Sequence, residues 1–225
     1  MDSVQFNSNK YGLALHTSSP ELGLALSNFA LNSRSSTWDL GRDLSSHLHQ
    51  HLADFIQPQT WADLAFIAVA IGPGSFTSTR IGVVTARTLG QQLNIPVFAI
   101  STLAAVAWSH LGLAKDNGKN AIAIQMPAQR GQSFAAIYQV SPSGSGLTQL
   151  LPDTVLTPTA WHQALETQSN TSYQLIDIPA GAGLGASVSS VLELAYLDWK
   201  QEKRPHWSEA LPFYGQHPVE DKPAG

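Results

Sequence analysis

The first sixty residues show a hydrophobic period that changes from strand to helix. Two apolar runs, 11–16 and 21–30, flank the turn T-S-S-P, and leucine occupies every second position from 22 to 26. This alternation predicts a β-hairpin. Residues 38–57 then place an apolar stripe along one face of a predicted helix, which Pro58 ends.

The next segment continues the alternation of strand and helix. The apolar run at 64–71 predicts a buried strand, followed by a turn, a helix to about residue 93, and a second strand at 95–100. Ser101 is a candidate cap for a further helix through residue 111. A hairpin followed by alternating helices and strands predicts an α/β fold around a mixed sheet.

The second half repeats this order less clearly. Runs at 120–126 and 132–140 predict another hairpin, and a helix, a strand and a helix follow at 157–167, 173–178 and 187–200.

We therefore expect two related halves. The first covers residues 1–103. The second, at 104–225, is reduced and ends in an irregular tail that is rich in proline.

Composition adds limits on function. Charged residues make up only 12% of the chain, against about 25% in an average globular protein, so we expect a partner to cover part of the surface. The net charge of -4, without a basic cluster, argues against nucleic-acid binding by this chain alone. The longest apolar run is far shorter than the ~20 residues of a membrane span, and the N-terminus shows no signal peptide. A cytoplasmic protein without membrane contact is expected.

The turn after the strand at 64–71 is the strongest local motif, G-P-G-S-F-T-S-T-R-I-G. It lacks the lysine of a phosphate-binding P-loop, and Thr77 stands where a dinucleotide loop needs its third glycine. Pro73 and Thr77 also replace the glycines of a nucleophile elbow around Ser75. We interpret the motif as a turn whose serine hydroxyl caps the next helix. Its residues are Gly72, Pro73, Gly74, Ser75, Phe76, Thr77 and Arg80.

Small residues recur at every fourth position of the helix after this turn, at Ser78, Gly82, Ala86 and Gly90. A glycine inside a helix costs about 0.5–1 kcal/mol relative to alanine, so close approach of another helix is expected to compensate. That helix is either the predicted one at 40–56 or one from another chain, and the pattern alone leaves both open.

The motif at 72–82, followed by a helix and I-P-V-F-A-I-S-T-L-A-A-V-A, resembles the signature of the TsaB (YeaZ) family, G-P-G-S-F-T-G-L-R-I-G, a helix and I-P-x-x-x-V-S-S-L. The start, Y-G-L-A-L-H-T-S-S-P-E-L-G-L-A-L, is similar to the hairpin of that family. The resemblance covers residues 11–108 well and the rest loosely.

This resemblance implies an actin-like ATPase (ASKHA, ribonuclease H-like) fold with a reduced second half. It also implies a non-catalytic subunit of tRNA N6-threonylcarbamoyladenosine synthesis, which binds and activates a TsaD-like catalytic subunit alongside a TsaE-like ATPase. ATP and metal would belong to those subunits, and tRNA would be reached only through the complex. The family interface is built from the N-terminal helices. On this chain the corresponding partner-facing residues are Leu44, Leu48, His51, Ser78, Gly82, Ala86 and Gly90.

Two departures from the family pattern argue against ATP hydrolysis. His16 stands where the family has aspartate, and the usual D-A-R appears as A-Q-R, so that only Arg130 remains. Mg²⁺ prefers oxygen ligands, which an imidazole cannot supply. The alternatives are a homodimeric or nucleotide-binding protein of this fold, or a peptidase, although no nucleophile–base motif supports the last.

Two further patterns carry weaker signals. Asp43, His47 and His51 lie four residues apart on one predicted helix face, a spacing that can bind zinc, but the glutamate of metalloproteases is missing. A polar or interfacial face is the favoured interpretation, and no metal is expected. The glycines in P-A-G-A-G-L-G, at 179–185, favour a flexible turn over a nucleotide contact.

Overall fold

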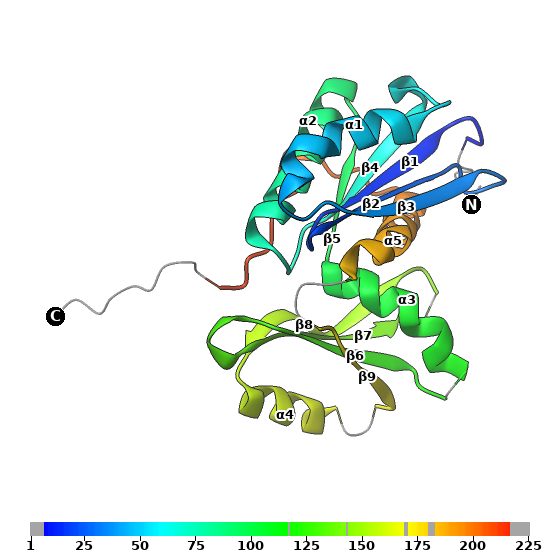
Figure 1. Ribbon diagram of the computed structural model, residues 1–225. Coiled ribbons are helices and arrows are strands. Elements are labelled where there is room, and N and C mark those ends of the chain that lie inside the picture. Colours follow the sequence, from blue (N-terminus) through cyan, green and yellow to red (C-terminus); the bar gives the residue numbers. More distant parts are fainter. Residues whose placement is uncertain (1–6, 117, 143, 169–170, 180–182, 217–225) are drawn as a thin grey trace.

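The computed structural model describes residues 7–116, 118–142, 144–168, 171–179 and 183–216. The described chain forms two mixed sheets, with helices packed between them and further helices on their outer faces (Figure 1). Of the helices in these ranges, none combines the length and apolar character that crossing a membrane requires.

The first sheet has five strands in the order β3-β2-β1-β4-β5. Strands β1 to β3 form an antiparallel meander, whereas β4 and β5 run parallel to β1. The strands are β1 (Tyr11–His16), β2 (Glu21–Ser27), β3 (Ser33–Asp39), β4 (Leu64–Ala70) and β5 (Val97–Ile100). The expected hairpin and mixed sheet are confirmed, and β3 is an additional strand.

Helices cover both faces of the first sheet. On one face lie α1 (Leu44–Ile56) and α2 (Phe76–Leu93), and on the other lies α5 (Val188–Lys200) (Figure 1). Alternation along the strands explains this division. Leu13 of β1 packs toward α1 and α2, while the next residue, Ala14, packs in the cluster that contains α5.

The second sheet has four strands in the order β8-β7-β6-β9, with α3 (Thr102–Asp116) on its inner side. Its strands are β6 (Ala121–Pro127), β7 (Ser133–Val140), β8 (Leu147–Leu156) and β9 (Tyr173–Asp177). Strand β9 runs parallel to β6, as β4 does to β1. No described strand pairs with the outer edge of β9, where the first sheet has β5, so this half is the reduced one.

Helix α4 (Pro158–Thr167) covers the outer face of the second sheet and buries Trp161 against it. The Thr157 hydroxyl caps this helix by accepting a hydrogen bond from the Ala160 N–H at 3.2 Å. The predicted cap on α3 is confirmed as well, because the Ser101 hydroxyl accepts from the Ala104 N–H at 3.1 Å.

One predicted boundary is wrong, and one strand is missing from the prediction. The helix expected from residue 38 begins at Leu44, because residues 33–39 form the edge strand β3, whose side chains alternate between exposed and half-buried. Strand β8 was not predicted, since it is another edge strand and contains Pro152, which edges tolerate.

Helix α5, which follows the second sheet in sequence, packs against β1 and β2 of the first sheet. The boundary at residue 103 stays a prediction. The first half as defined by sequence nevertheless needs α5 to cover one face of its sheet.

Candidate functional site

The G-P-G-S turn joins the end of β4 to the β1–β2 turn. The Ser75 N–H donates to the Ser18 carbonyl oxygen at 2.7 Å. A Cβ atom on Gly74 would lie 2.1 Å from that same oxygen, so this position requires glycine. The motif therefore fixes the start of α2 against the hairpin.

Ser75 occupies the cap position of α2, but the predicted side-chain cap is wrong. Its hydroxyl donates to the Ser78 hydroxyl at 3.0 Å and makes no capping bond to a backbone N–H. The Arg80 guanidinium lies over the ring of Phe76, 5.3 Å from its centroid. Because the hydrogen-bond partner of the Ser75 hydroxyl is another serine and not a base, this arrangement does not resemble a nucleophile–base pair.

The row of small residues on α2 faces the interior of the same chain. A Cβ atom on Gly82 would lie 2.2 Å from Thr17 Oγ1, and one on Gly90 would lie 2.3 Å from Val97 Cγ2. Ala86, between them, is fully buried. The close neighbours are therefore a turn and a strand, and neither of the two helices considered from the sequence.

Five predicted partner-facing positions are consequently corrected. Gly82, Ala86 and Gly90 are buried against their own chain. Leu44 and Leu48 lie on the inner side of α1 and are only 2% and 0% exposed. Fully buried side chains cannot contact a partner directly.

The other two positions reach the surface only in part. His51 is half-buried and stacks against Trp38, with ring centroids 4.6 Å apart. Ser78 is half-buried, and its carbonyl oxygen accepts a hydrogen bond from the Thr17 hydroxyl at 2.8 Å. A direct partner role for these two residues stays a prediction.

The spacing of Asp43, His47 and His51 does not assemble a metal site. His47 Nδ1 lies 3.1 Å from the backbone oxygen of Asp43, so the carboxylate is not what it contacts. No group of three or more histidine, aspartate or glutamate side chains in the described part of the chain is arranged to hold an ion.

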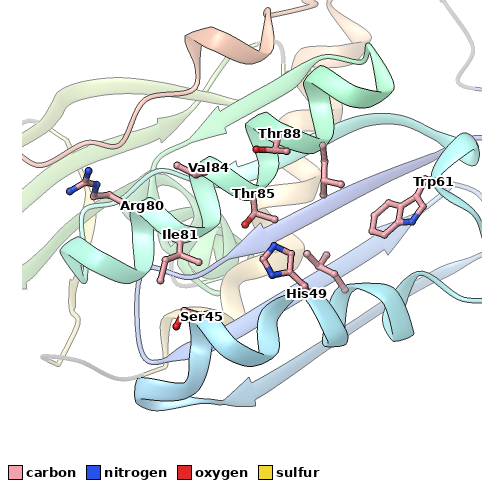
Figure 2. A pocket seen from close by; sticks show the side chains of 10 residues that line it. Ser45, His49, Trp61, Arg80, Ile81, Val84, Thr85 and Thr88 are labelled. Atoms are coloured by element: carbon pink, nitrogen blue, oxygen red, sulfur yellow. The ribbon is translucent and has the colours of Figure 1, made fainter.

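An apolar groove runs between α1 and α2 on the outer face of the first half (Figure 2). It encloses about 600 Å³. His49 points into it from α1, while Trp61 stands at the end opposite Arg80 (Figure 2). The lining residues are Ser45, His49, Leu52, Trp61, Arg80, Ile81, Val84, Thr85, Thr88 and Leu89.

The groove arises because each helix packs one side against the sheet and leaves another side facing outward. Leu48 and Leu52 of α1 and Val83 and Ala86 of α2 pack inward on the sheet. Val84 then points outward and is 59% exposed, although it is fully apolar. Other half-buried apolar residues line the same groove, and contiguous apolar surface of this kind marks binding sites in soluble proteins.

Sequence reasoning missed the groove residues Ile81, Val84 and Trp61. A signal was present, because Phe76, Arg80 and Val84 follow one another at intervals of four on the side of α2 opposite its glycines. An apolar residue on this outward side of α2 does not contribute to the core, and so it indicates a binding surface.

A buried polar cluster lies at the end of β1. His16 is fully buried, its Nδ1 accepts from the Ser18 N–H at 3.4 Å, and its Nε2 has no hydrogen-bond partner in the described structure. Burial lowers the pKa of His16 from 6.5 to about 4, against a smaller opposing effect of Glu21. The imidazole is therefore neutral near pH 7.

Glu21 binds the described part of the glycine loop. Its carboxylate accepts from the Gly183 N–H at 2.8 Å, the Gly185 N–H at 3.1 Å and the Ser19 hydroxyl at 2.9 Å. Partial burial acts to raise the pKa of Glu21, but these hydrogen bonds and the nearby His16 outweigh it and hold the pKa below its ordinary value. Gly181 lies outside the described residues.

A family model described as TsaD, tRNA N6-adenosine threonylcarbamoyltransferase, matches residues 47–189. The tRNA threonylcarbamoyladenosine biosynthesis protein TsaB of Bacillus subtilis (strain 168) is 36% identical over 107 residues, which are 46% of this chain and 42% of that protein. The TsaB of Escherichia coli (strain K12) is 33% identical over 82 residues, 36% of this chain and 34% of that protein.

Among solved structures, YeaZ from Pseudomonas aeruginosa superposes with a TM-score of 0.70 at 22% identity, covering 91% of this chain and 99% of that one. A structure described as similar to peptidase YeaZ, from the same organism, gives a TM-score of 0.71 at 21% identity, with coverage of 92% and 100%. These likenesses concern the fold.

The paired mixed sheets and their helices define an actin-like ATPase (ASKHA, ribonuclease H-like) fold, as expected from the sequence. Within that class, the chain belongs to the TsaB/YeaZ family. The sequence matches span less than half of the two curated TsaB relatives.

Proposed function

We propose that this chain is a non-catalytic subunit of tRNA N6-threonylcarbamoyladenosine synthesis, in which it binds and activates a TsaD-like catalytic subunit. Family membership supports the pathway. In this proposal the complex works in the cytoplasm with a TsaE-like ATPase, and tRNA is reached only through the assembled subunits.

The α1–α2 groove is the observation that carries this proposal. It offers apolar walls from both helices, with Val84 59% exposed at its edge. A partner that inserts apolar side chains there would remove this surface from water, at roughly 25 cal/mol per Å² of apolar area. The low charge of the whole chain fits a protein whose surface is partly covered in its working state.

The residues near β1 support a role without catalysis by this chain. A Mg²⁺–ATP site of this fold would need an oxygen ligand at the end of β1, but His16 supplies a buried neutral imidazole. The Glu21 carboxylate is already engaged by two backbone amides and a hydroxyl. These residues do not fit a metal-bound nucleotide, so ATP and metal are assigned to the partner subunits.

The groove proposal predicts that Val84→Asp weakens binding to the TsaD subunit of the same cell by about a hundredfold. The reason is that an unpaired carboxylate is costly to bury in an apolar contact. Binding is measured by calorimetry, and threonylcarbamoyl transfer to tRNA is assayed with the same samples.

Gln91→Asp is the matched control, because it places the same charge on an exposed position of α2 that does not line the groove. We expect this control to bind and activate like the wild type. The proposal is wrong if the wild-type chain neither binds the TsaD subunit nor changes its rate.

A further inference from the structure

We infer that the α1–α2 groove takes an apolar partner surface that carries a carboxylate opposite Arg80, and that its charge pattern disfavours a second copy of this chain. This inference rests on the proposed function, because it specifies the chemistry of the partner at the same groove.

The groove presents cationic and neutral groups but no acidic ones. Arg80 stands at one end and His49 points into the middle (Figure 2), and no aspartate or glutamate is among the described residues that line it. Helix α2 as a whole contains two arginines and no acidic residue. In a chain with a net charge of -4, this surface departs locally from the overall balance.

The acidic residue carried by α1 points elsewhere. Asp54 follows Ser45 by nine positions, which places it about 180° around the helix from the groove side. Its carboxylate accepts hydrogen bonds from the Gln50 side chain at 2.9 and 3.0 Å, on the exposed outer side. It therefore does not neutralise the Arg80 charge at the groove.

Arg80 has a charge that its own chain leaves without a counter-ion. Its side chain is exposed, and within the described residues it has no ion-pair partner; its guanidinium lies over the Phe76 ring. A guanidinium pairs with a carboxylate through two parallel hydrogen bonds, which fixes both position and orientation. A carboxylate on the partner, beside its apolar contact surface, is the complementary group.

A second copy of this chain cannot supply that group from the same surface. In a two-fold dimer each groove meets the same patch of the other copy. Each Arg80 would then face the groove of the other copy, whose described lining contains no aspartate or glutamate. Apolar contact alone would hold such a dimer, so the acidic heteropartner is favoured over self-association.

The test measures calorimetric binding of the TsaD subunit at 50 and 300 mM NaCl. At the lower salt concentration, we expect Arg80→Gln to weaken binding by about fivefold and Arg80→Glu by well over tenfold, as for loss and reversal of an interfacial ion pair. The wild-type affinity should fall with salt, and Arg80→Gln should show a shallower fall.

Arg87→Gln is the matched control on the same helix. The Arg87 guanidinium lies 5.9 Å from the Trp207 ring centroid and does not line the groove, so its loss should change affinity less than about twofold. Thermal unfolding of each variant verifies that the fold is intact.

The outcomes separate the two proposals. If Val84→Asp blocks binding while both Arg80 variants match the wild type in affinity and salt dependence, the groove is the interface and the charge inference is overturned. If neither position affects binding, the proposed groove fails as well. Sedimentation at 50 mM NaCl is the second readout, and a wild-type homodimer tighter than the complex would also overturn the inference.

Discussion

His16 shows how one residue can report on both function and stability. It stands at the end of β1, where the resemblance to the family leads one to expect a carboxylate, and it is completely enclosed. The sequence alone indicates that metal chemistry is weakened there. Only the structure shows that the imidazole is uncharged, because burial is a property of the packed chain and not of the local motif.

The burial of His16 predicts a loss of stability in mild acid. Its folded pKa of about 4 lies below the unfolded value of 6.5, so the unfolded state binds the proton first as pH falls. Stability is therefore fully present above pH 6.5 and decreases as the pH falls toward 4. From pH 7 to 5 this group should remove about 2 kcal/mol from the free energy of unfolding.

Urea unfolding at the two pH values measures this effect. His16→Asn should show a smaller decrease between pH 7 and 5, whatever its stability at pH 7. Gln91→Asn is the control, since Gln91 is exposed on α2 and has no titratable group, so that it should leave the wild-type decrease unchanged. An equal decrease in wild type and His16→Asn would show that other groups cause the acid sensitivity.

At the scale of elements, the sequence predicted the position of α2 correctly but not the neighbours that its small residues contact. Its existence, its start after the G-P-G-S turn and its row of small residues were all visible in the sequence. The partner of that row was not, because a glycine row indicates close packing without naming the neighbour. Helix packing was expected, whereas the β1–β2 turn and β5 occupy the space.

The edge strands were missed for a related reason. Strand β3 is largely polar and β8 contains a proline, so neither has the continuous apolar character of the central strands. Edge strands lie beside solvent, and their sequences are under weaker hydrophobic constraint. The groove residues of α1 and α2 were missed because their exposure depends on how two helices lie together.

The packing of α2 predicts that Gly82→Ala destabilises the protein, although alanine favours helices by about 1 kcal/mol. The added methyl would lie 2.2 Å from Thr17 Oγ1, so the turn or the helix must move. We expect a net loss of about 1–3 kcal/mol in the free energy of unfolding, measured by urea denaturation.

The double variant Gly82→Ala with Thr17→Ala tests the cause. Removing the Thr17 hydroxyl relieves the contact, so the two losses should sum to more than the loss in the double variant. Gln91→Ala, on the exposed side of the same helix, should stay within about 0.5 kcal/mol of wild type. Simple additivity of the Gly82 and Thr17 changes would contradict the close approach.

At the scale of the whole molecule, the polar contacts of Glu21 determine whether a nucleotide can bind. The β1–β2 turn and the loop before α5 come from opposite ends of the chain, and Glu21 joins them through the Gly183 and Gly185 amides. Sequence reasoning treated these glycines as a flexible turn and did not anticipate this contact. A separation of 162 residues between Glu21 and Gly183 has no local signal.

These contacts predict that the isolated chain does not bind Mg²⁺–ATP. A ligand present at a hundred times its dissociation constant would stabilise the folded state by about 2.7 kcal/mol, which a thermal scan detects easily. We expect no shift of the melting temperature at millimolar Mg²⁺–ATP. His16→Asp should behave the same way, because the loop amides remain bound to Glu21 even when an oxygen ligand is restored.

The TsaE-like ATPase of the same cell provides the positive control for nucleotide and metal in this scan. A saturable upward shift for the wild-type chain would contradict both the lack of fit at His16 and the assignment of ATP to the partner subunits. A shift for His16→Asp alone would be more informative still. It would mean that the imidazole is the sole obstacle, and that Glu21 releases the Gly183 and Gly185 amides when a nucleotide competes for them.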